Sequence, residues 1–290
     1  MKFALSSVQG LAHQKAQPII PRQDSAACFV INDEICVGIV SDGAGSSKNS
    51  HIAANLCVEK LAEVVKRDFD EVLGLNVLED AKLEWDFLSK SWFCEVRDEL
   101  LDYCVKNDGE VGDFNCTLIL VIKTKDKFFA CNVGDGRAGA SSGMRVFPII
   151  VPFMTFIVGA TYFVIKEDWG RFFRSYVLDA VVHCDYFFIS TDGPQNYLID
   201  QDPQLKVTDN RIYEDIMPGE VYYDSNLLYK PFFEGVIDSL KEVSSQDERN
   251  ERLSELLQLG KYQIRGEIRI LDSLIKPELD DDKSLIVFYN

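Results

Sequence analysis

Short apolar runs separated by polar turns dominate the first 40 positions of the chain. Apolar residues fill most of positions 3–8, 26–31 and 35–40. Runs of this length, rich in β-branched and aromatic residues, are typical of strands. The pattern therefore predicts a strand, a loop and then a β-hairpin that turns at residues 32–33.

A helical period replaces the strand pattern between residues 50 and 105. Apolar side chains recur three or four positions apart in residues 56–65 and again in residues 85–100, which is the spacing of one helical face. We predict two long amphipathic helices, separated by a loop near residues 74–76, that cover one face of the fold. Residues 232–259 show the same period and are also predicted to be helical.

Further strand patterns follow the first two helices. Residues 117–122 and 127–133 predict a second hairpin, and residues 184–191 and 285–289 predict two more strands. In contrast, residues 195–231 are rich in Asp, Pro, Tyr and Asn without a clear period. We predict a surface loop or insertion there, in which substrate selection would lie if the protein is an enzyme.

An uncharged segment at residues 146–165 is long enough to form a membrane-spanning helix. However, Pro148, Pro152 and Gly159 interrupt it, and β-branched and aromatic residues dominate it. We therefore predict two or three buried strands instead of a membrane span. The residues that follow, 167–179, are expected to form a turn and a short helix.

The composition of the 290 residues is that of a globular protein with a sizeable core, 47% hydrophobic and 27% charged. No internal repeat, low-complexity tract or Gly/Ser linker divides the chain, so we predict a single domain spanning residues 1–290. A formal net charge of -17 argues against binding to nucleic acid or to an anionic membrane, because both need clustered cations. Divalent metal could still neutralise an acidic site.

The eight cysteines form no CxxC pair, and most of them lie inside apolar runs. This arrangement is typical of the reduced, buried thiols of cytosolic proteins. With only three histidines and no paired cysteines, a zinc site is not expected. The first ten residues hold too few apolar side chains for a signal peptide, and we predict a cytoplasmic protein.

Acidic turns lie at the ends of four predicted strands. Asp42 and Asp192 each end a strand and precede a glycine, Asp135 follows the strand 127–133, and residues 280–282 precede the last strand. Each aspartate could simply cap a turn. Together, however, they predict one oxygen-rich centre for a hard cation such as Mg²⁺ or Mn²⁺, since glycine also lets a backbone carbonyl approach the ion.

Short motifs follow one another in order along almost the whole chain. They are Gly10-x-x-His13, Gln23-Asp24-Ser25, Ser41-Asp42-Gly43-Ala44-Gly45-Ser46, Asn115-Cys116-Thr117, Asn132-Val133-Gly134-Asp135-Gly136-Arg137, Thr161-Tyr162-Phe163, Ser190-Thr191-Asp192-Gly193 and Asp281-Asp282-Lys283-Ser284. In this order the motifs resemble those of the metal-dependent type 2C serine/threonine protein phosphatases, in particular the bacterial branch of that family.

The resemblance implies an α+β fold, a four-layer α/β/β/α sandwich in which a central antiparallel β-sandwich is flanked by helices. It also implies a metal centre at one end of the sandwich. Asp42 stands where the family has the carboxylate that bridges two metal ions, and the carbonyl of Gly43 would help to hold one of them. Asp192 and Asp281 stand where the family holds the other ion.

Further acidic positions carry weaker implications. Asp24 matches a residue that hydrogen-bonds or ligates near the centre, and Asp135 falls where a third, more weakly held ion is bound. Asn196 stands where a second ligand of that third ion is often acidic. Within residues 280–282, the spacing to the last strand favours Asp281 as the ligand over Asp282.

The activity implied by the resemblance is hydrolysis of phosphoserine and phosphothreonine in protein substrates. In the expected reaction, a water that bridges two Mg²⁺ or Mn²⁺ ions attacks the phosphate, and the ions clamp the phosphoryl oxygens. Asp42, Asp192 and Asp281 are predicted to be the catalytic ligands. The expected partner is a phosphorylated protein, together with a serine/threonine kinase that the enzyme would oppose.

Several positions depart from the family pattern. Gln23 stands where many members have Glu, which would weaken the binding of one ion, and Ala44 replaces a histidine used by some members near the leaving group. Ile19 stands where many members have an arginine that grips the substrate phosphate. Arg22 and His13 are therefore the candidates for phosphate binding in this chain.

These departures leave a second hypothesis open, a catalytically weak pseudophosphatase that serves as a binding or regulatory module. Gln23 and Ala44 favour it. The joint presence of Asp42, Asp192 and Asp281 favours the active enzyme, because a carboxylate cluster without metal is destabilised by like-charge repulsion.

Overall fold

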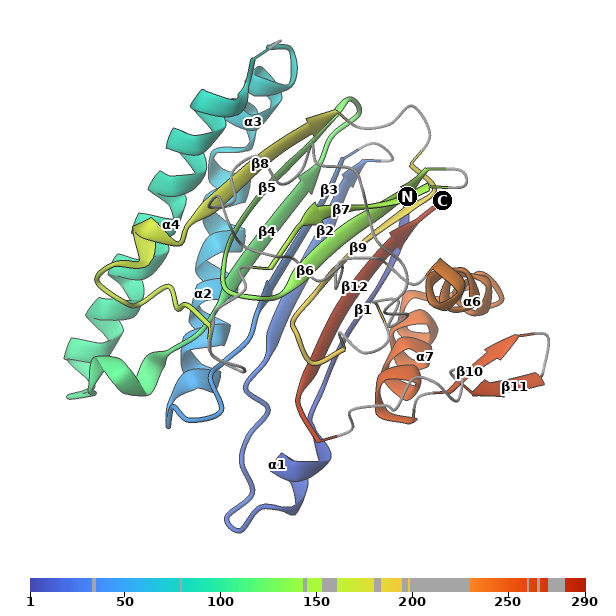
Figure 1. Cartoon of the computed structure of the whole chain (residues 1–290), viewed down its shortest axis with the longest axis horizontal. Coiled ribbons are helices and arrows are strands. Elements are labelled where there is room, and N and C mark those ends of the chain that lie inside the picture. The colour runs from blue at the N-terminus through green and yellow to red at the C-terminus, as the bar shows by residue number, and fades with distance from the viewer. Residues whose placement is uncertain are drawn as a thin grey trace, which may run out of the picture.

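Two five-stranded antiparallel sheets lie face to face at the centre of the molecule (Figure 1). The computed structural model describes residues 1–32, 35–78, 80–142, 145–152, 161–179, 184–194, 198, 230–259, 261–264, 267–270 and 280–290. The first sheet has the order β1 (Lys2–Val8), β12 (Lys283–Tyr289), β9 (Tyr186–Ser190), β6 (Arg137–Ser142) and β7 (Arg145–Ile150). The second has the order β2 (Ser25–Asn32), β3 (Ile35–Ser41), β4 (Leu118–Lys123), β5 (Lys127–Val133) and β8 (Arg174–Asp179).

The central strands are buried on both faces, which explains their continuous apolar sequences. In β3, Cys36 and Val40 point into the core between the sheets, whereas Val37 and Ile39 point toward helices. Successive side chains of a strand alternate between the two faces of the sheet, so both sets must be apolar here. The inter-sheet core includes the closely stacked rings of Phe187 and Phe288, whose centroids lie 4.3 Å apart.

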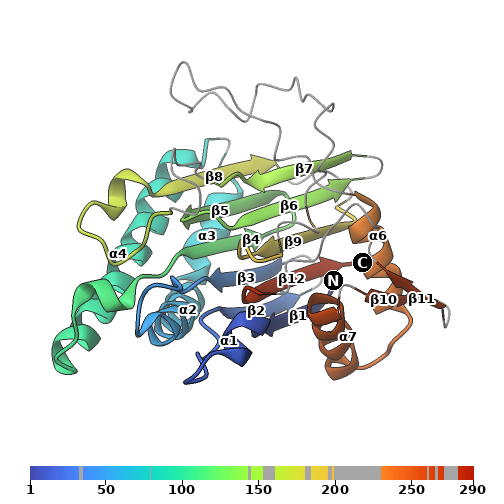
Figure 2. The same ribbon diagram turned by 60° about the horizontal axis from the view of Figure 1, so that its bottom comes forward.

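Helices cover the outer face of each sheet, as Figure 2 shows from a second direction. The second sheet carries α2 (Ser50–Arg67), α3 (Phe69–Asn76) and α4 (Lys82–Lys106), and the first carries α6 (Lys230–Lys241) and α7 (Gln246–Leu259). Trp85 of α4 fixes its helix to the sheet by donating its Nε1–H to the Ala130 carbonyl at 2.9 Å. On the other side, Phe233 of α6 stacks on Phe188 at 4.3 Å. The predicted four-layer α+β sandwich is thus confirmed.

Smaller elements connect the layers. They are the short helix α1 (Leu11–Lys15), the 3₁₀ turns η1 (Val111–Phe114) and η2 (Trp169–Arg171), and a separate hairpin of β10 (Lys261–Ile264) and β11 (Glu267–Ile270). The pairing of β1 with β12 brings the two ends of the chain side by side (Figure 1).

Two predicted elements are wrong. Residues 74–76 belong to α3 and do not form a loop, because Gly74 lies in open space where a missing side chain loses no packing. Residues 174–179 form β8, an edge strand paired with β5, where a short helix was expected. Phe173 and Val177 are four positions apart, a spacing that also occurs on one face of a helix. In the structure Phe173 precedes β8 and Val177 lies within it, and both side chains pack against the helical layer.

The uncharged segment at residues 146–165 is described in part. Its first residues form the end of β7, residues 161–165 lie outside any strand, and residues 153–160 lie outside the described residues. No helix in the described part of the chain is both long and apolar enough to span a membrane. Of the predicted loop at residues 195–231, only residue 198 and the start of α6 belong to the described part, and Asn196 lies outside it.

Candidate metal centre

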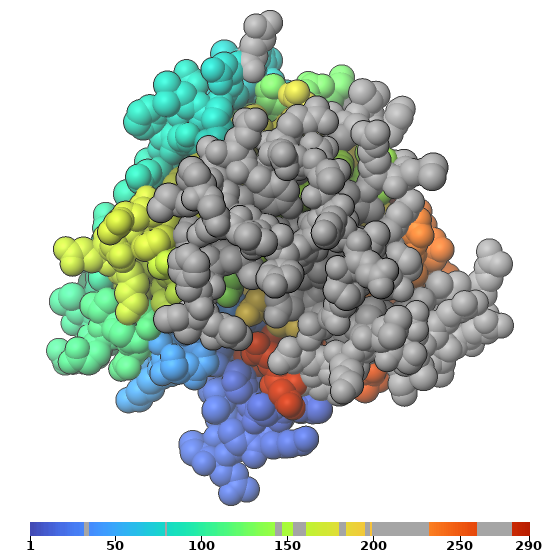
Figure 3. Space-filling view, viewed as in Figure 1, coloured from blue at the N-terminus to red at the C-terminus, as the bar shows by residue number. Residues whose placement is uncertain are grey.

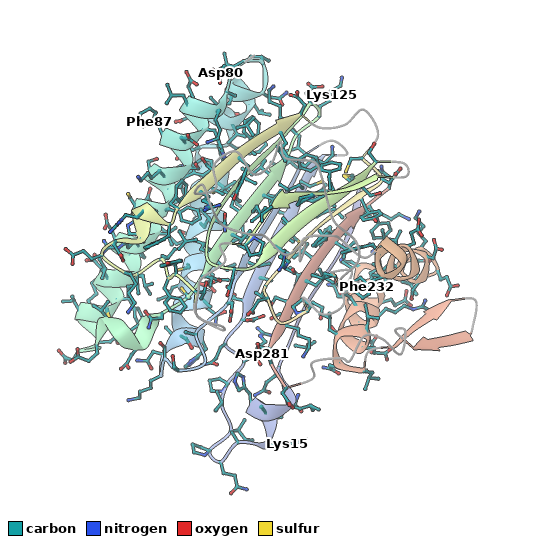
Figure 4. The ribbon with its side chains drawn as sticks, in the orientation of Figure 1. Lys15, Asp80, Phe87, Lys125, Phe232 and Asp281 are labelled. Carbon is teal, nitrogen blue, oxygen red and sulfur yellow. The ribbon has the colours of Figure 1, made fainter. Side chains whose placement is uncertain are left out.

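Four strand ends meet at one end of the sandwich. Ser41 at the end of β3 pairs with Ser25 at the start of β2, and Ser190 at the end of β9 pairs with Leu285 near the start of β12. Antiparallel neighbours necessarily place the end of one strand beside the start of the next. The acidic turns attached to these strands therefore come together, and Asp281 marks their position at the start of β12 (Figure 4).

Three of the predicted ligands form the most compact group. Asp42, Asp135 and Asp192 each offer one carboxylate oxygen, and these oxygens lie within 4.8 Å of one another. All three side chains are half-buried. Their separation along the sequence, from just after β3 to just after β9, shows that the sandwich assembles the group.

Hydrogen bonds to Thr117 hold the turn that carries Asp42. The Asp42 N–H donates to Thr117 Oγ1 at 2.9 Å, and the Thr117 N–H donates to the Asp42 carbonyl at 2.8 Å. Gly43, the predicted carbonyl ligand, forms a bridge with Cys116. A Cβ on Gly43 would lie 2.7 Å from the Gln23 carbonyl oxygen, so only glycine allows this close approach.

Asp24 lies immediately before β2 and is almost completely buried. Thr191 Oγ1 donates to Asp24 Oδ2 at 2.7 Å and accepts from the Ser284 N–H at 3.0 Å, so one hydroxyl links β2, β9 and β12. Burial, with the negative charges of Asp282 and Asp192, raises the pKa of Asp24 to about 7 despite the hydrogen bond from Thr191. Thr191 was part of a sequence motif, but nothing in the sequence paired it with Asp24.

The neighbours Asp281 and Asp282 have different surroundings. Asp282 is buried, and its carboxylate binds the N-terminal segment: Oδ1 accepts from the Gly10 N–H at 2.7 Å and Oδ2 from the Gln23 N–H at 2.5 Å. His13 Nδ1 lies 3.0 Å from the same Oδ1. Asp281 remains open to solvent, and its pKa is raised to about 6 by partial removal from water and by the charge of Asp192.

The contact between the N-terminal segment and the start of β12 is visible at the surface, where the blue and red segments adjoin in Figure 3. Because both oxygens of Asp282 are occupied by protein donors, Asp281 is the member of the pair available for an ion. This difference agrees with the choice of Asp281 from its spacing to the last strand.

Among the described residues, positive charge offsets the acidic group only in part. Burial raises the pKa values of Asp42 and Asp135, and the negative charge of Asp24 adds to the effect on Asp42. Arg137 opposes the shift at Asp135. Asp24 Oδ1 and Asp135 Oδ1 are buried and have no hydrogen-bond partner in the described part of the chain. Buried acceptors without donors, in a cluster of carboxylates, fit a hard cation that prefers oxygen ligands.

The remaining candidates surround the acidic group. Gln23 is buried, donates from Nε2 to Ser50 Oγ at 2.7 Å, and leaves Oε1 without a partner among the described residues. Arg22 is exposed, with Nε donating to the Asp24 carbonyl at 3.1 Å and Nη1 to the Ser7 carbonyl at 2.9 Å. Thus Arg22 is fixed beside Asp24, while the ring of His13 is fixed by Asp282.

A cavity of about 560 Å³ lies apart from the acidic turns, between the first half of α4 and β8. Its lining combines apolar side chains with the cations Lys82, Lys90, Arg171 and Arg174 and the single acid Asp86. None of the candidate metal ligands lines it. No sequence pattern predicted this cavity, because its lining residues come from separate segments.

Comparisons with known proteins agree with this geometry. Residues 9–258 match the family model described as Protein phosphatase 2C. Over 212 residues the chain is 24% identical to serine/threonine-protein phosphatase 3 of Escherichia coli (strain K12). The aligned region covers 70% of this chain and 79% of the relative.

Solved structures share the fold at low sequence identity. The serine/threonine phosphatase Stp1 from Staphylococcus aureus superposes with a TM-score of 0.58 at 13% identity, covering 100% of this chain and 95% of that one. The catalytic domain of the serine/threonine protein phosphatase PstP, solved in complex with two manganese ions, gives a TM-score of 0.51 at 15% identity, covering 99% and 96%. Since the family model spans most of the chain, this protein belongs to the protein phosphatase 2C family.

Proposed function

We propose that this protein is a metal-dependent phosphatase that hydrolyses phosphoserine and phosphothreonine in protein substrates. The observation that carries the proposal is the convergence of Asp42, Asp135 and Asp192 to within 4.8 Å, in a member of a phosphatase family. The buried acceptors without donors, Asp24 Oδ1 and Asp135 Oδ1, support a cation at the same place.

The proposed cofactor is Mg²⁺ or Mn²⁺, two ions with room for a third. The proposed ligands are Asp42, Asp192, Asp281, the Gly43 carbonyl, Asp24 and Asp135. When bound, such ions lower the pKa of water and neutralise the phosphoryl oxygens. The structure of the relative PstP with two manganese ions makes manganese the first ion to test.

The chain itself contributes position and charge. The paired hydrogen bonds with Thr117 hold the backbone of Asp42, and Thr191 orients one oxygen of Asp24 while leaving the other free. Arg22, fixed at the surface beside Asp24, is the proposed contact for the substrate phosphate, with His13 as the alternative. A guanidinium suits this role because its planar donors match phosphate oxygens.

The proposed substrate is a phosphorylated protein, with a kinase as the opposing enzyme. We also propose that the protein acts in the cytoplasm, because its eight cysteines are free and six of them are buried, as is common where thiols stay reduced.

The alternative, a pseudophosphatase, is favoured by one observation. Gln23 offers the acidic group a neutral amide oxygen, and that oxygen has no partner among the described residues. A neutral ligand attracts a cation less strongly than a carboxylate does. The experiment below separates weak metal binding from absent catalysis.

Hydrolysis of a phosphothreonine peptide would be measured with Mn²⁺, with Mg²⁺ and with EDTA, for the wild type and for Asp42→Asn and Asp192→Asn. Asp280→Asn is the matched control, because it removes the same charge one residue from Asp281. We expect metal-dependent turnover that falls by about 100-fold or more in the two ligand variants and persists in the control.

Calorimetric titration with Mn²⁺ accompanies the assay. Metal binding without turnover of any phosphopeptide would favour the pseudophosphatase, with Gln23→Glu as the first reversion. If neither metal binding nor turnover occurs, the acidic group is not a metal centre and the proposal is wrong.

A further inference from the structure

Helix α4 has two apolar faces, although it packs on the molecule with only one. Its buried residues, among them Trp85, Trp92 and Val96, face the sheet and α2. On the outside, Leu83, Phe87 and Val105 are 60%, 71% and 77% exposed. Figure 4 shows Phe87 at the outer edge of the helical layer. Large apolar side chains exposed along one line of a helix commonly mark an interaction surface.

The outer residues follow a regular spacing. We call them the outer seam: Leu83, Phe87, Lys90, Cys94, Asp98, Leu101 and Val105, with intervals of four, three, four, four, three and four. At 3.6 residues per turn this series forms one line along α4, on the side away from Trp85 and Trp92. Leu101 is half-buried and packs in part against the core, and Lys90 also lines the cavity beside β8. Alternating steps of three and four residues are the pattern by which two helices pack along each other.

Residues at equal distances on either side of Cys94 in the outer seam are complementary, apolar with apolar and cation with anion. Counting outward from Cys94, Lys90 and Asp98 are each four residues away, Phe87 and Leu101 seven, and Leu83 and Val105 eleven. If a second α4 runs antiparallel to the first about a two-fold axis at Cys94, each apolar residue meets an apolar residue. Lys90 meets Asp98, its opposite charge. An interface of this kind, in which one patch binds its own copy, is isologous.

We propose that the outer seam of α4 is the interface of a symmetric homodimer, in which the α4 helices of two copies pack antiparallel. The seam spans 22 residue steps, or about 33 Å. The exposed Val77 and Val111 lie just beyond the two ends of the helix and would extend the apolar contact. An unrelated partner would need no such symmetry, so the seam favours a second copy of this chain as its occupant.

Charge supports the same arrangement. Lys90 and Asp98 are exposed, and neither is held in an ion pair by another described residue. Two chains of net charge -17 repel each other over long distances, and physiological salt reduces that repulsion to a range of about 8 Å. The Lys90–Asp98 contacts act at shorter range, within the interface.

Sedimentation velocity of the full-length protein at 0.15 M salt, from 1 to 100 µM, tests the proposal. We expect a dimer. Lys90→Asp and Asp98→Lys each place like charges opposite one another and should weaken association by about tenfold or more. The double variant Lys90→Asp/Asp98→Lys restores both pairs and should restore the dimer. Lys106→Asp and Glu99→Lys are the matched controls, since they make the same charge changes outside the seam.

Cross-linking gives an independent readout. Cys94, the exposed cysteine, lies on the expected two-fold axis, where helix axes 8–10 Å apart bring two thiols within reach of a short bis-maleimide. We expect a cross-linked dimer for the wild type and the double variant, and its loss in Lys90→Asp and in Cys94→Ser. Circular dichroism would verify that each variant folds.

Two outcomes would overturn the proposal: a monomer at every concentration, or a dimer unaffected by the single charge reversals. Either outcome would mean that the outer seam is not a homodimer interface and that any partner it has is a different molecule. The result does not depend on the proposed function, because none of the seam residues belongs to the acidic group.

Discussion

Asp24 is a buried carboxylate of the acidic group whose ionised form is disfavoured by loss of water and by neighbouring negative charges. Thr191 donates a hydrogen bond to one oxygen of this buried carboxylate, and the other oxygen has no hydrogen-bond partner among the described residues. A buried carboxylate is stable only if hydrogen bonds or a cation replace the water that it has lost. In the metal-free protein, Thr191 therefore stabilises the ionised form of Asp24. When metal is bound, we expect the ion to stabilise it.

Removal of the Thr191 hydroxyl tests this dependence. In Thr191→Val, Asp24 loses its donor and the Ser284 N–H loses its acceptor, and we expect the free energy of unfolding to fall by about 1–3 kcal/mol. The affinity for Mn²⁺ should fall as well, because the hydrogen bond favours the ionised carboxylate. Urea unfolding and calorimetric titration measure the two effects.

Thr191→Ser is the control, since it keeps the hydroxyl and removes only a methyl group. We expect it to lie close to the wild type in both measurements. If Ser destabilises while Val lies close to the wild type, then packing of the methyl group, and not the hydrogen bond, holds this residue in place.

Stability against pH gives a second test at this scale. The pKa of Asp24 is about 7 in the folded chain against an ordinary value of 3.8, and that of Asp281 is about 6. Between about pH 4 and pH 7 the folded protein therefore binds more protons than the unfolded chain does. In EDTA, its stability should fall as the pH rises through this window, by several kcal/mol.

Added Mn²⁺ should reverse this trend, because the ion binds the deprotonated carboxylates. Asp24→Asn isolates one contributor: we expect the decline in EDTA to become smaller in this variant. A metal-free protein that gains stability from pH 5 to pH 7.5 would contradict the raised pKa values. Urea unfolding at a series of pH values provides the measurement.

At the scale of elements, Asp282 joins the N-terminal segment to β12. Its two oxygens accept from Gly10 and Gln23, at the two ends of the loop that carries α1, and His13 adds a third contact. Gly193 contributes to the same junction, since a Cβ there would collide with the Asp282 carbonyl. The loop before Asp24 is thus held from the start of β12, and not by its own secondary structure.

Asp282→Asn should loosen this junction. The amide replaces one acceptor oxygen with a donor that faces N–H groups, so we expect a loss of about 1–3 kcal/mol in the free energy of unfolding. Hydrogen exchange should accelerate in residues 10–24 and less elsewhere. Asp280→Asn, with the same chemical change at an exposed neighbour, should leave exchange unchanged. Uniform acceleration over the whole chain would mean that Asp282 has no local role.

The elements differ in how far the sequence determines them. The hairpins β2–β3 and β4–β5 were predicted because turn residues separate apolar runs, a local signal. β8 was not, because its half-buried side chains depend on β5 for their environment. Among the site residues, Asp42, Asp135 and Asp192 could be placed from strand-ending turns. The contacts of Asp282 with Gly10 and of Thr191 with Asp24 join residues more than 160 positions apart, and no local pattern reports such a contact.

At the scale of the whole molecule, charge is distributed unevenly. The chain has a formal net charge of -17, and the proposed catalytic end carries a cluster of aspartates. The cavity between α4 and β8 instead carries four cations and one acid. A phosphorylated substrate that approaches the molecule therefore meets a repulsive long-range field, with one local region of the opposite sign.

If the protein is the proposed phosphatase, peptide charge should control its efficiency at low salt. Of two phosphothreonine peptides of equal length, the one flanked by lysines should exceed the one flanked by glutamates by about tenfold in kcat/KM at 20 mM salt, mainly through KM. The ratio should shrink toward unity at 0.5 M salt, where charges separated by more than about 4 Å are screened. Both peptides carry the same phosphate, so the chemical step is matched between them. A preference for the acidic peptide would mean that a local basic surface outweighs the net charge, and Arg171→Glu would then test the cavity as that surface.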